Sequence, residues 1–166
     1  LTVIFDLTVA IEVGLVIACV LFMKRVMETT EISVITDEID PNKESDIAVH
    51  EENLMIPKGI EVYEINGPYF FGIATKFEET MTQLGDRPKV RIIRMRKVPF
   101  IDSTGIHNLT TLCEMSQKEK TTVILSGVNE NVHNVLEKAG FYELLGKENI
   151  CPNINVALER AKSLVK

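Results

Sequence analysis

The first 23 residues of the chain are almost entirely apolar, and they limit its possible folds more than any other feature. They read LTVIFDLTVAIEVGLVIACVLFM, and as a helix they are long enough to cross the hydrocarbon core of a bilayer. Their apolar residues surround the whole helix and form no single stripe, which argues against an amphipathic helix in a soluble core. Lys24 and Arg25 follow directly, as is typical of a cytoplasmic flank. The sequence therefore predicts a transmembrane helix over residues 1–25.

Two acidic residues, Asp6 and Glu12, interrupt this apolar run. A carboxylate inside a membrane is costly unless it faces protein or water, so we expect both side chains to point into a helix bundle. A signal peptide fits poorly, because no basic segment precedes the run and the positive charges follow it. The inward-facing acids and the missing initiating Met predict that the chain is a fragment whose larger membrane part lies upstream.

Residues 26–56 change from apolar to acidic character. Pro41 interrupts them, few large apolar residues are available for burial, and nine carboxylates lie among them: Glu28, Glu31, Asp37, Glu38, Asp40, Glu44, Asp46, Glu51 and Glu52. We therefore predict a mobile or loosely helical linker, part of which continues the membrane helix. The net charge of −6 for the whole chain argues against binding to nucleic acid.

From residue 57 onward, short β-rich runs alternate with segments of helical pattern. The strand candidates are 59–65, 69–74, 90–95 and 121–125, and Asn66-Gly67-Pro68 is a turn sequence between the first two. The helix candidates are 76–84, 104–118, 130–139 and 155–165. This alternation predicts one α/β domain over residues 57–166, with a mixed or mainly parallel sheet covered by helices.

The usual catalytic signatures are missing from the chain. The phosphate-binding patterns GxxxxGK[ST] and GxGxxG are absent, as are the GxSxG nucleophile motif and the HExxH zinc motif. The histidines and cysteines are scattered and lack the spacing of metal ligands: His50, His107, His133, Cys19, Cys113 and Cys151. We therefore predict that the chain is not an enzyme and has no metal or cofactor site.

The segment KVPFIDSTGIHNL, residues 97–109, places an acid, two hydroxyls and a glycine between a strand candidate and a helix. Asp102, Ser103 and Thr104 are residue types preferred at helix N-caps, where each is worth about 1 kcal/mol relative to Ala. A helix N-terminus also presents free backbone N–H groups and the positive end of a dipole, so it attracts phosphate. Gly105 permits close approach of another backbone. Capping alone, and capping combined with a phosphate or partner site, both fit these residues.

The segment PFIDSTG followed by a helix resembles the STAS domain, which bacterial anti-anti-sigma factors share with the SulP family of anion transporters. Two further segments are similar to the transporter branch. Residues 1–25 resemble the last membrane helix of SulP proteins, and residues 126–161, SGVNENVHNVLEKAGFYELLGKENICPNINVALERA, resemble the end of their STAS domain. The three blocks occur in the family's order, and the resemblance covers nearly the whole chain.

The resemblance implies a compact STAS domain in the cytoplasm, attached to a transporter for sulfate, bicarbonate or related anions in the inner (plasma) membrane. In anti-anti-sigma factors the second hydroxyl residue of the DS[ST]G motif accepts phosphate. This role maps onto Thr104, with Ser103 beside it and Asp102 shaping the turn. The implied partners are the upstream membrane domain, a second copy in a homodimer, and a kinase or other cytosolic protein. Asp6 and Glu12 would then serve packing between transporter helices, because a negative charge repels a bound anion.

We therefore expect a non-catalytic regulatory and interaction module that docks partners on the helix beginning at Thr104. A membrane-tethered switch similar to anti-anti-sigma factors, without transport function, is the alternative. The reading frame upstream of Leu1 separates the two, because only a transporter requires many further hydrophobic spans there. A nucleotide-binding module is a third hypothesis, which rests on the α/β fold alone.

Overall fold

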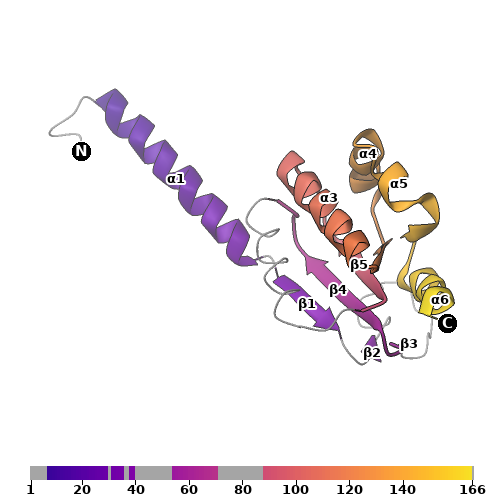
Figure 1. Ribbon diagram of the computed structural model, residues 1–166. Coiled ribbons are helices and arrows are strands. Elements are labelled where there is room, and N and C mark those ends of the chain that lie inside the picture. The colour runs from indigo at the N-terminus through magenta and orange to yellow at the C-terminus, as the bar shows by residue number, and fades with distance from the viewer. Residues whose placement is uncertain (1–6, 30, 36–37, 40–53, 71–87, 166) are drawn as a thin grey trace. The chain divides into compact units, whose positions relative to one another are not determined.

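The computed structural model describes residues 7–29, 31–35, 38–39, 54–70 and 88–165 of the chain (Figure 1). These residues belong to two compact units, Leu1–Thr30 and Glu31–Lys166. The described part of the first unit is a single helix, and the second unit contains the described strands and the other helices. Asp6 and the helix predicted at 76–84 lie outside the described residues.

Helix α1, Leu7–Thr29, contains most of the N-terminal apolar run. Its segment Leu7–Val26 is long and apolar enough to cross a membrane. A lone helix has no core in which to bury large apolar side chains, and several are accordingly exposed: Leu15, Ile17 and Phe22. The helix continues beyond the predicted span, as expected, and Lys24 and Glu28 form an exposed ion pair at 3.9 Å, one turn apart.

The second unit is built on a five-stranded sheet with the order β1-β4-β5-β6-β7 (Figure 1). Its strands are β1 (Glu31–Ile35), β4 (Ile60–Asn66), β5 (Val90–Lys97), β6 (Thr122–Ser126) and β7 (Ile150–Cys151). β1 runs antiparallel to β4, and the other neighbouring pairs are parallel. The predicted α/β class with a mixed, mainly parallel sheet is therefore confirmed. The short strands β2 (Glu38–Ile39) and β3 (Leu54–Met55) form a separate antiparallel pair.

The prediction of a loose linker over 26–56 is wrong for β1, which is a full edge strand of the main sheet. Its five residues pair in unbroken register with β4, from Glu31 opposite Asn66 to Ile35 opposite Val62. Ile35 also packs against the hydrophobic core. The β-branched run Ile-Ser-Val-Ile supplies strand propensity and apolar contacts that the surrounding acidic composition conceals.

The predicted strand at 69–74 also differs from the structure where it is described. Tyr69 and Phe70 are buried, and Tyr69 forms only a single parallel bridge with Ile101. No hairpin with β4 is available, because β1 and β5 occupy the two edges of that strand.

The described helices of this unit are α3 (Ser103–Lys118), α4 (Glu130–Lys138), α5 (Phe141–Leu145) and α6 (Ile154–Val165), with a 3-10 turn η2 (Lys147–Asn149). Helices α3, α4 and α6 confirm the three helices predicted from residue 104 onward. In α6, Leu158 belongs to the core cluster that contains Ile92 of β5. Arg91, whose side chain points to the opposite face from Ile92, donates a hydrogen bond to Ser116 of α3. α3 and α6 therefore cover opposite faces of the sheet.

Candidate functional site

The start of helix α3 is fixed by Asp102, which is its N-cap residue. Asp102 has extended backbone angles, φ −94° and ψ 175°, and its Oδ1 accepts a hydrogen bond of 2.6 Å from the Gly105 N–H. Its carbonyl oxygen accepts from the Ile106 N–H at 2.9 Å. The predicted cap is therefore confirmed, and it satisfies one of the donors that a helix N-terminus leaves without an intrahelical partner.

Gly105 lies where the backbone near Tyr69 meets the first turn of α3. A Cβ added to Gly105 would lie far inside contact distance of the Tyr69 carbonyl oxygen and 2.9 Å from Ile101 Cγ1. The same carbonyl accepts a hydrogen bond from the Asp102 N–H at 3.4 Å, and the Tyr69 N–H donates to the Phe100 carbonyl at 3.1 Å. The close backbone approach predicted for this glycine is therefore confirmed, and its partner is the segment that follows β4.

Ser103 and Thr104 are exposed in the first turn of α3. Among the described residues, neither their hydroxyls nor their backbone N–H groups have a hydrogen-bond partner. Two hydroxyls and two free N–H groups thus lie together at the positive end of a helix of 16 residues. Within the described part of the chain no acid or base is bonded to either hydroxyl, and both hydroxyls are accessible to a group that modifies or binds them.

Two neighbouring residues complete this surface, and the sequence did not single them out. Phe100 is 52% exposed beside the motif and adds an apolar ring to this surface. Asn129 caps α4 by accepting from the Val132 N–H at 2.9 Å, and its amide donates to the Val98 carbonyl at 2.5 Å. Asn129 thereby ties the start of α4 to the connection between β5 and α3. An asparagine before a predicted helix indicates an N-cap, so that role of Asn129 could be found from the sequence. Its contact with Val98 depends on the tertiary fold and could not.

Glu12, the other predicted polar residue that the structure describes, lies in helix α1 and belongs to a different unit from the Asp102–Gly105 motif. The predicted residues Asp102–Gly105 therefore form one local site in the second unit, whereas Glu12 belongs to the first unit and is not part of that site. No group of three or more potential metal ligands occurs among the described residues.

The buried charges of the sheet form structural pairs. Arg94 of β5 contacts Glu64 of β4 at 3.1 Å, and Arg91 lies 3.8 Å from Glu61. Burial, together with a hydrogen bond to Glu61, raises the pKa of Tyr63 well above its ordinary value. These groups link neighbouring strands and do not converge on the hydroxyls of α3.

Burial also raises the pKa of the Cys113 thiol to about 12. A thiol with such a pKa stays protonated near neutral pH, and only the thiolate is a good nucleophile. Cys113 is therefore a core residue on the sheet-facing side of α3.

Comparison with known proteins defines the family. The STAS domain model matches residues 53–157, which contain the Asp102–Gly105 motif and helices α3 to α5. The chain belongs to the STAS domain family. The STAS domain of a SulP transporter from Vibrio cholerae is 35% identical, with a TM-score of 0.60, covering 67% of this chain and 87% of that structure. A sulfate transporter family protein from Wolinella succinogenes is 44% identical, with a TM-score of 0.65, covering 68% of this chain and 92% of that structure. The resemblance to SulP transporters is therefore confirmed.

The similarity to a full-length relative extends beyond the STAS domain. The putative sulfate transporter YvdB of Bacillus subtilis is 27% identical over 150 residues, which cover 90% of this chain. Because 90% of the 166 residues are covered, about 17 lie outside the alignment, which therefore includes part of the first 30 residues. This chain spans about a quarter, 26%, of the length of YvdB.

Proposed function

We propose that this chain is the C-terminal part of a SulP-type secondary anion transporter. Residues 1–25 would form the last span in the plasma membrane, which is the inner membrane of a bacterium, and the STAS domain would lie in the cytoplasm. The observation that carries this proposal is the similarity to YvdB, which reaches from the STAS domain into the first unit. The length and apolar character of Leu7–Val26 support it further.

The STAS domain would act as a non-catalytic regulatory and interaction module for the transporter. Its docking surface would be the start of α3, where Ser103 and Thr104 are exposed beside the exposed ring of Phe100. Phosphorylation of either hydroxyl by a cytosolic kinase would add almost two negative charges at the helix N-terminus. The helix dipole would stabilise this phosphate, so the modification would change the charge of the surface without unfolding the helix. The membrane domain and a second copy in a homodimer would be its other partners.

The test compares sulfate uptake and partner capture by the full-length transporter and by the variant Ser103→Ala/Thr104→Ala. We expect the double variant to retain its fold, since Asp102 still caps α3, and to lose the regulated change in uptake and the capture of its partner. Thr111→Ala, at another exposed hydroxyl of α3, is the matched control. Unaltered regulation and partner capture in the double variant would remove the role assigned to these hydroxyls.

The upstream reading frame tests the transporter itself. A transporter requires about a dozen further hydrophobic spans before Leu1, each of roughly 20 residues. A start codon close to Leu1 would instead favour the membrane-tethered switch without transport function.

A further inference from the structure

Helix α3, strand β6 and the α5–η2 segment border a cavity of about 280 Å³. The residues that line it include the following: Cys113, Gln117, Lys120, Thr121, Val123 and Leu145. The cavity lies at the C-terminal end of α3, far along the helix from Ser103 and Thr104, so it is distinct from the site above. An engineered cavity of about 150 Å³ accommodates benzene, so this volume suits a ligand of roughly ten non-hydrogen atoms.

The hydrogen bonds around the cavity indicate which ligand chemistry fits. The Gln117 amide donates to the Leu144 carbonyl at 3.3 Å, and the Thr121 hydroxyl donates to the Pro88 carbonyl at 2.7 Å. Among the described residues, the Lys120 ammonium has no such partner. An ammonium donates hydrogen bonds and carries a positive charge, so the complementary ligand carries an acceptor, and an anionic one is favoured.

Lys120 also has an unusual backbone conformation. Its φ is +62°, and it is the one residue other than glycine with a positive φ in the described part of the chain. It directly follows the C-cap of α3, where the Thr121 N–H bonds to the Ser116 carbonyl at 2.8 Å. Glycine is the usual residue at such a position because a Cβ is disfavoured there. Lys120 therefore takes the position that glycine usually has at this kind of helix end, and it lines the cavity.

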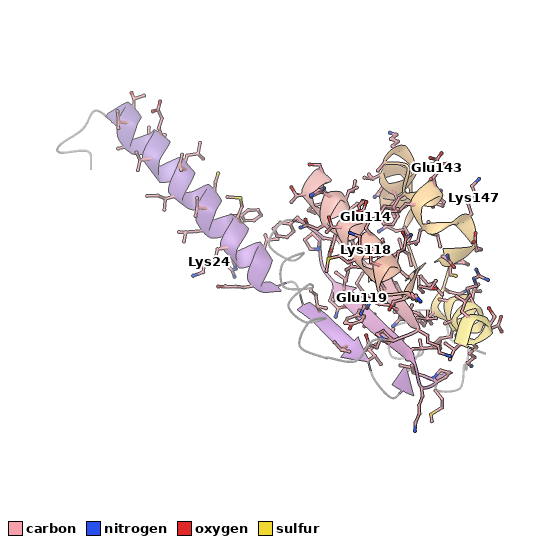
Figure 2. All side chains as sticks on the ribbon, in the orientation of Figure 1. Lys24, Glu114, Lys118, Glu119, Glu143 and Lys147 are labelled. Atoms are coloured by element: carbon pink, nitrogen blue, oxygen red, sulfur yellow. The ribbon has the colours of Figure 1, made fainter. Side chains whose placement is uncertain are left out.

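Among the described residues that line the cavity, Lys120 is the one with a charged side chain. Arg91 pairs in register with Val123 of the cavity wall, but its guanidinium is already paired with Glu61. Figure 2 shows charges of both signs on the bordering elements, on α3 and on the α5–η2 segment: Glu114, Lys118, Glu119, Glu143 and Lys147. Three of these five exposed residues are acidic and two are basic, whereas Lys120 is the charged residue that lines the cavity itself in the described part of the chain.

We propose that this cavity binds a small organic carboxylate. The apolar body of the ligand would contact Val123 and Leu145, and its carboxylate would accept a charge-assisted hydrogen bond from the Lys120 ammonium. This binding does not depend on the transporter function proposed above, because it involves the other end of α3.

The test measures binding of 4-fluorobenzoate by fluorine NMR to the whole chain in lipid nanodiscs, with empty nanodiscs as the blank. We expect saturable binding, and about tenfold weaker binding of the neutral 4-fluorobenzamide, since a charged hydrogen bond is lost. Lys120→Asn removes the ammonium while asparagine tolerates the left-handed backbone, so we expect about tenfold weaker binding of the carboxylate. Lys120→Arg keeps the charge and retains binding.

Lys118→Gln is the matched control, because Lys118 is exposed on α3 and does not line the cavity. We expect it to bind 4-fluorobenzoate like the wild type. Thermal unfolding without ligand shows whether each variant is folded. Lys120→Gly is expected to raise the melting temperature, because glycine adopts the positive φ readily, and to weaken carboxylate binding, because it lacks the ammonium. No saturable signal above empty nanodiscs, or equal binding by the wild type and a folded Lys120→Asn variant, would overturn the proposal.

Discussion

Single residues of the Asp102–Gly105 motif have structural tasks that determine what its hydroxyls can do. The Asp102 N–H donates a hydrogen bond to the Tyr69 carbonyl. Gly105 has no side chain, so the first turn of α3 can approach the same carbonyl closely. Ser103 and Thr104 lie between them and are exposed. The acid and the glycine therefore hold the turn in place, and the two hydroxyls are free to react or to bind.

Replacing Gly105 by Ala tests this division of tasks, because two effects oppose each other. Alanine favours an exposed helix by about 1 kcal/mol relative to glycine. At Gly105, however, the new methyl group would collide with the Tyr69 carbonyl and with Ile101, and overpacking of this kind costs about 1–3 kcal/mol. We expect net destabilisation in urea unfolding followed by circular dichroism, whereas Ser103→Ala at the exposed neighbouring position changes stability little. A more stable Gly105→Ala variant would show that Tyr69 and Ile101 shift at little energetic cost to make room for the methyl group.

Cys113 gives the domain a pH dependence in the alkaline range. Its folded pKa is about 12, against an ordinary thiol value of 9.0, because burial disfavours the thiolate. Below about pH 9 the thiol is protonated in both the folded and the unfolded protein, so its ionisation does not lower the free energy of unfolding. Above that pH the unfolded state loses the proton first, so stability falls by up to about 1.4 kcal/mol per pH unit.

The measurement is the free energy of unfolding between pH 8 and 10.5 for the wild type and for Cys113→Ala, both in the same detergent. The variant has a constant loss from the smaller side chain, but it lacks the thiol titration. We expect the difference between the two proteins to shrink as the pH rises. Parallel curves would show that Cys113 titrates normally in the folded protein.

Among the helices and strands, those long enough to show a clear pattern of apolar residues were predictable from the sequence. β4, β5 and β6 are short runs rich in apolar residues and largely buried on both faces, whereas α3, α4 and α6 offer several apolar residues at the spacing of one helix face. β7 has two residues and α5 has five, which is too short for a period to be visible. β1 was missed because its apolar residues lie within an acidic segment. The cap and the glycine contact followed from local residue preferences, but Tyr69 joins the site through tertiary contacts that no local pattern records.

Helix α3 depends on its cap, and Asp102→Ala measures how much. The substitution removes the 2.6 Å hydrogen bond to the Gly105 N–H and leaves that donor without its side-chain partner. We expect a loss of about 1 kcal/mol in the free energy of unfolding, measured by urea titration. Asp102→Asn is the matched control, since asparagine caps a helix about as well as aspartate. Equal losses in the two variants would mean that the carboxylate charge, and not the cap hydrogen bond, stabilises the start of α3.

Considered as a whole, the folded unit is longer than the segment that identifies its family. The STAS model begins at residue 53, whereas the compact unit begins at Glu31 and includes β1. β1 covers the outer edge of β4, and an uncovered strand edge is a template for association with other chains. The short segment between α1 and the STAS core thus completes the sheet, in contrast to the purely connecting role that its acidic composition suggested.

Two truncated proteins, residues 31–166 and residues 54–166, test this contribution of β1. Both lack the apolar helix, and they differ in residues 31–53, which contain β1, paired with β4 from Glu31 to Ile35, and β2, paired with β3. The shorter protein loses those backbone hydrogen bonds and the packing of Ile35 on the core, and it exposes the edge of β4. We expect it to unfold at a lower temperature and to associate increasingly with concentration in light scattering, relative to residues 31–166. If the two proteins unfold at the same temperature and show the same mass at every concentration, β1 adds nothing to the domain and the STAS core is complete without it.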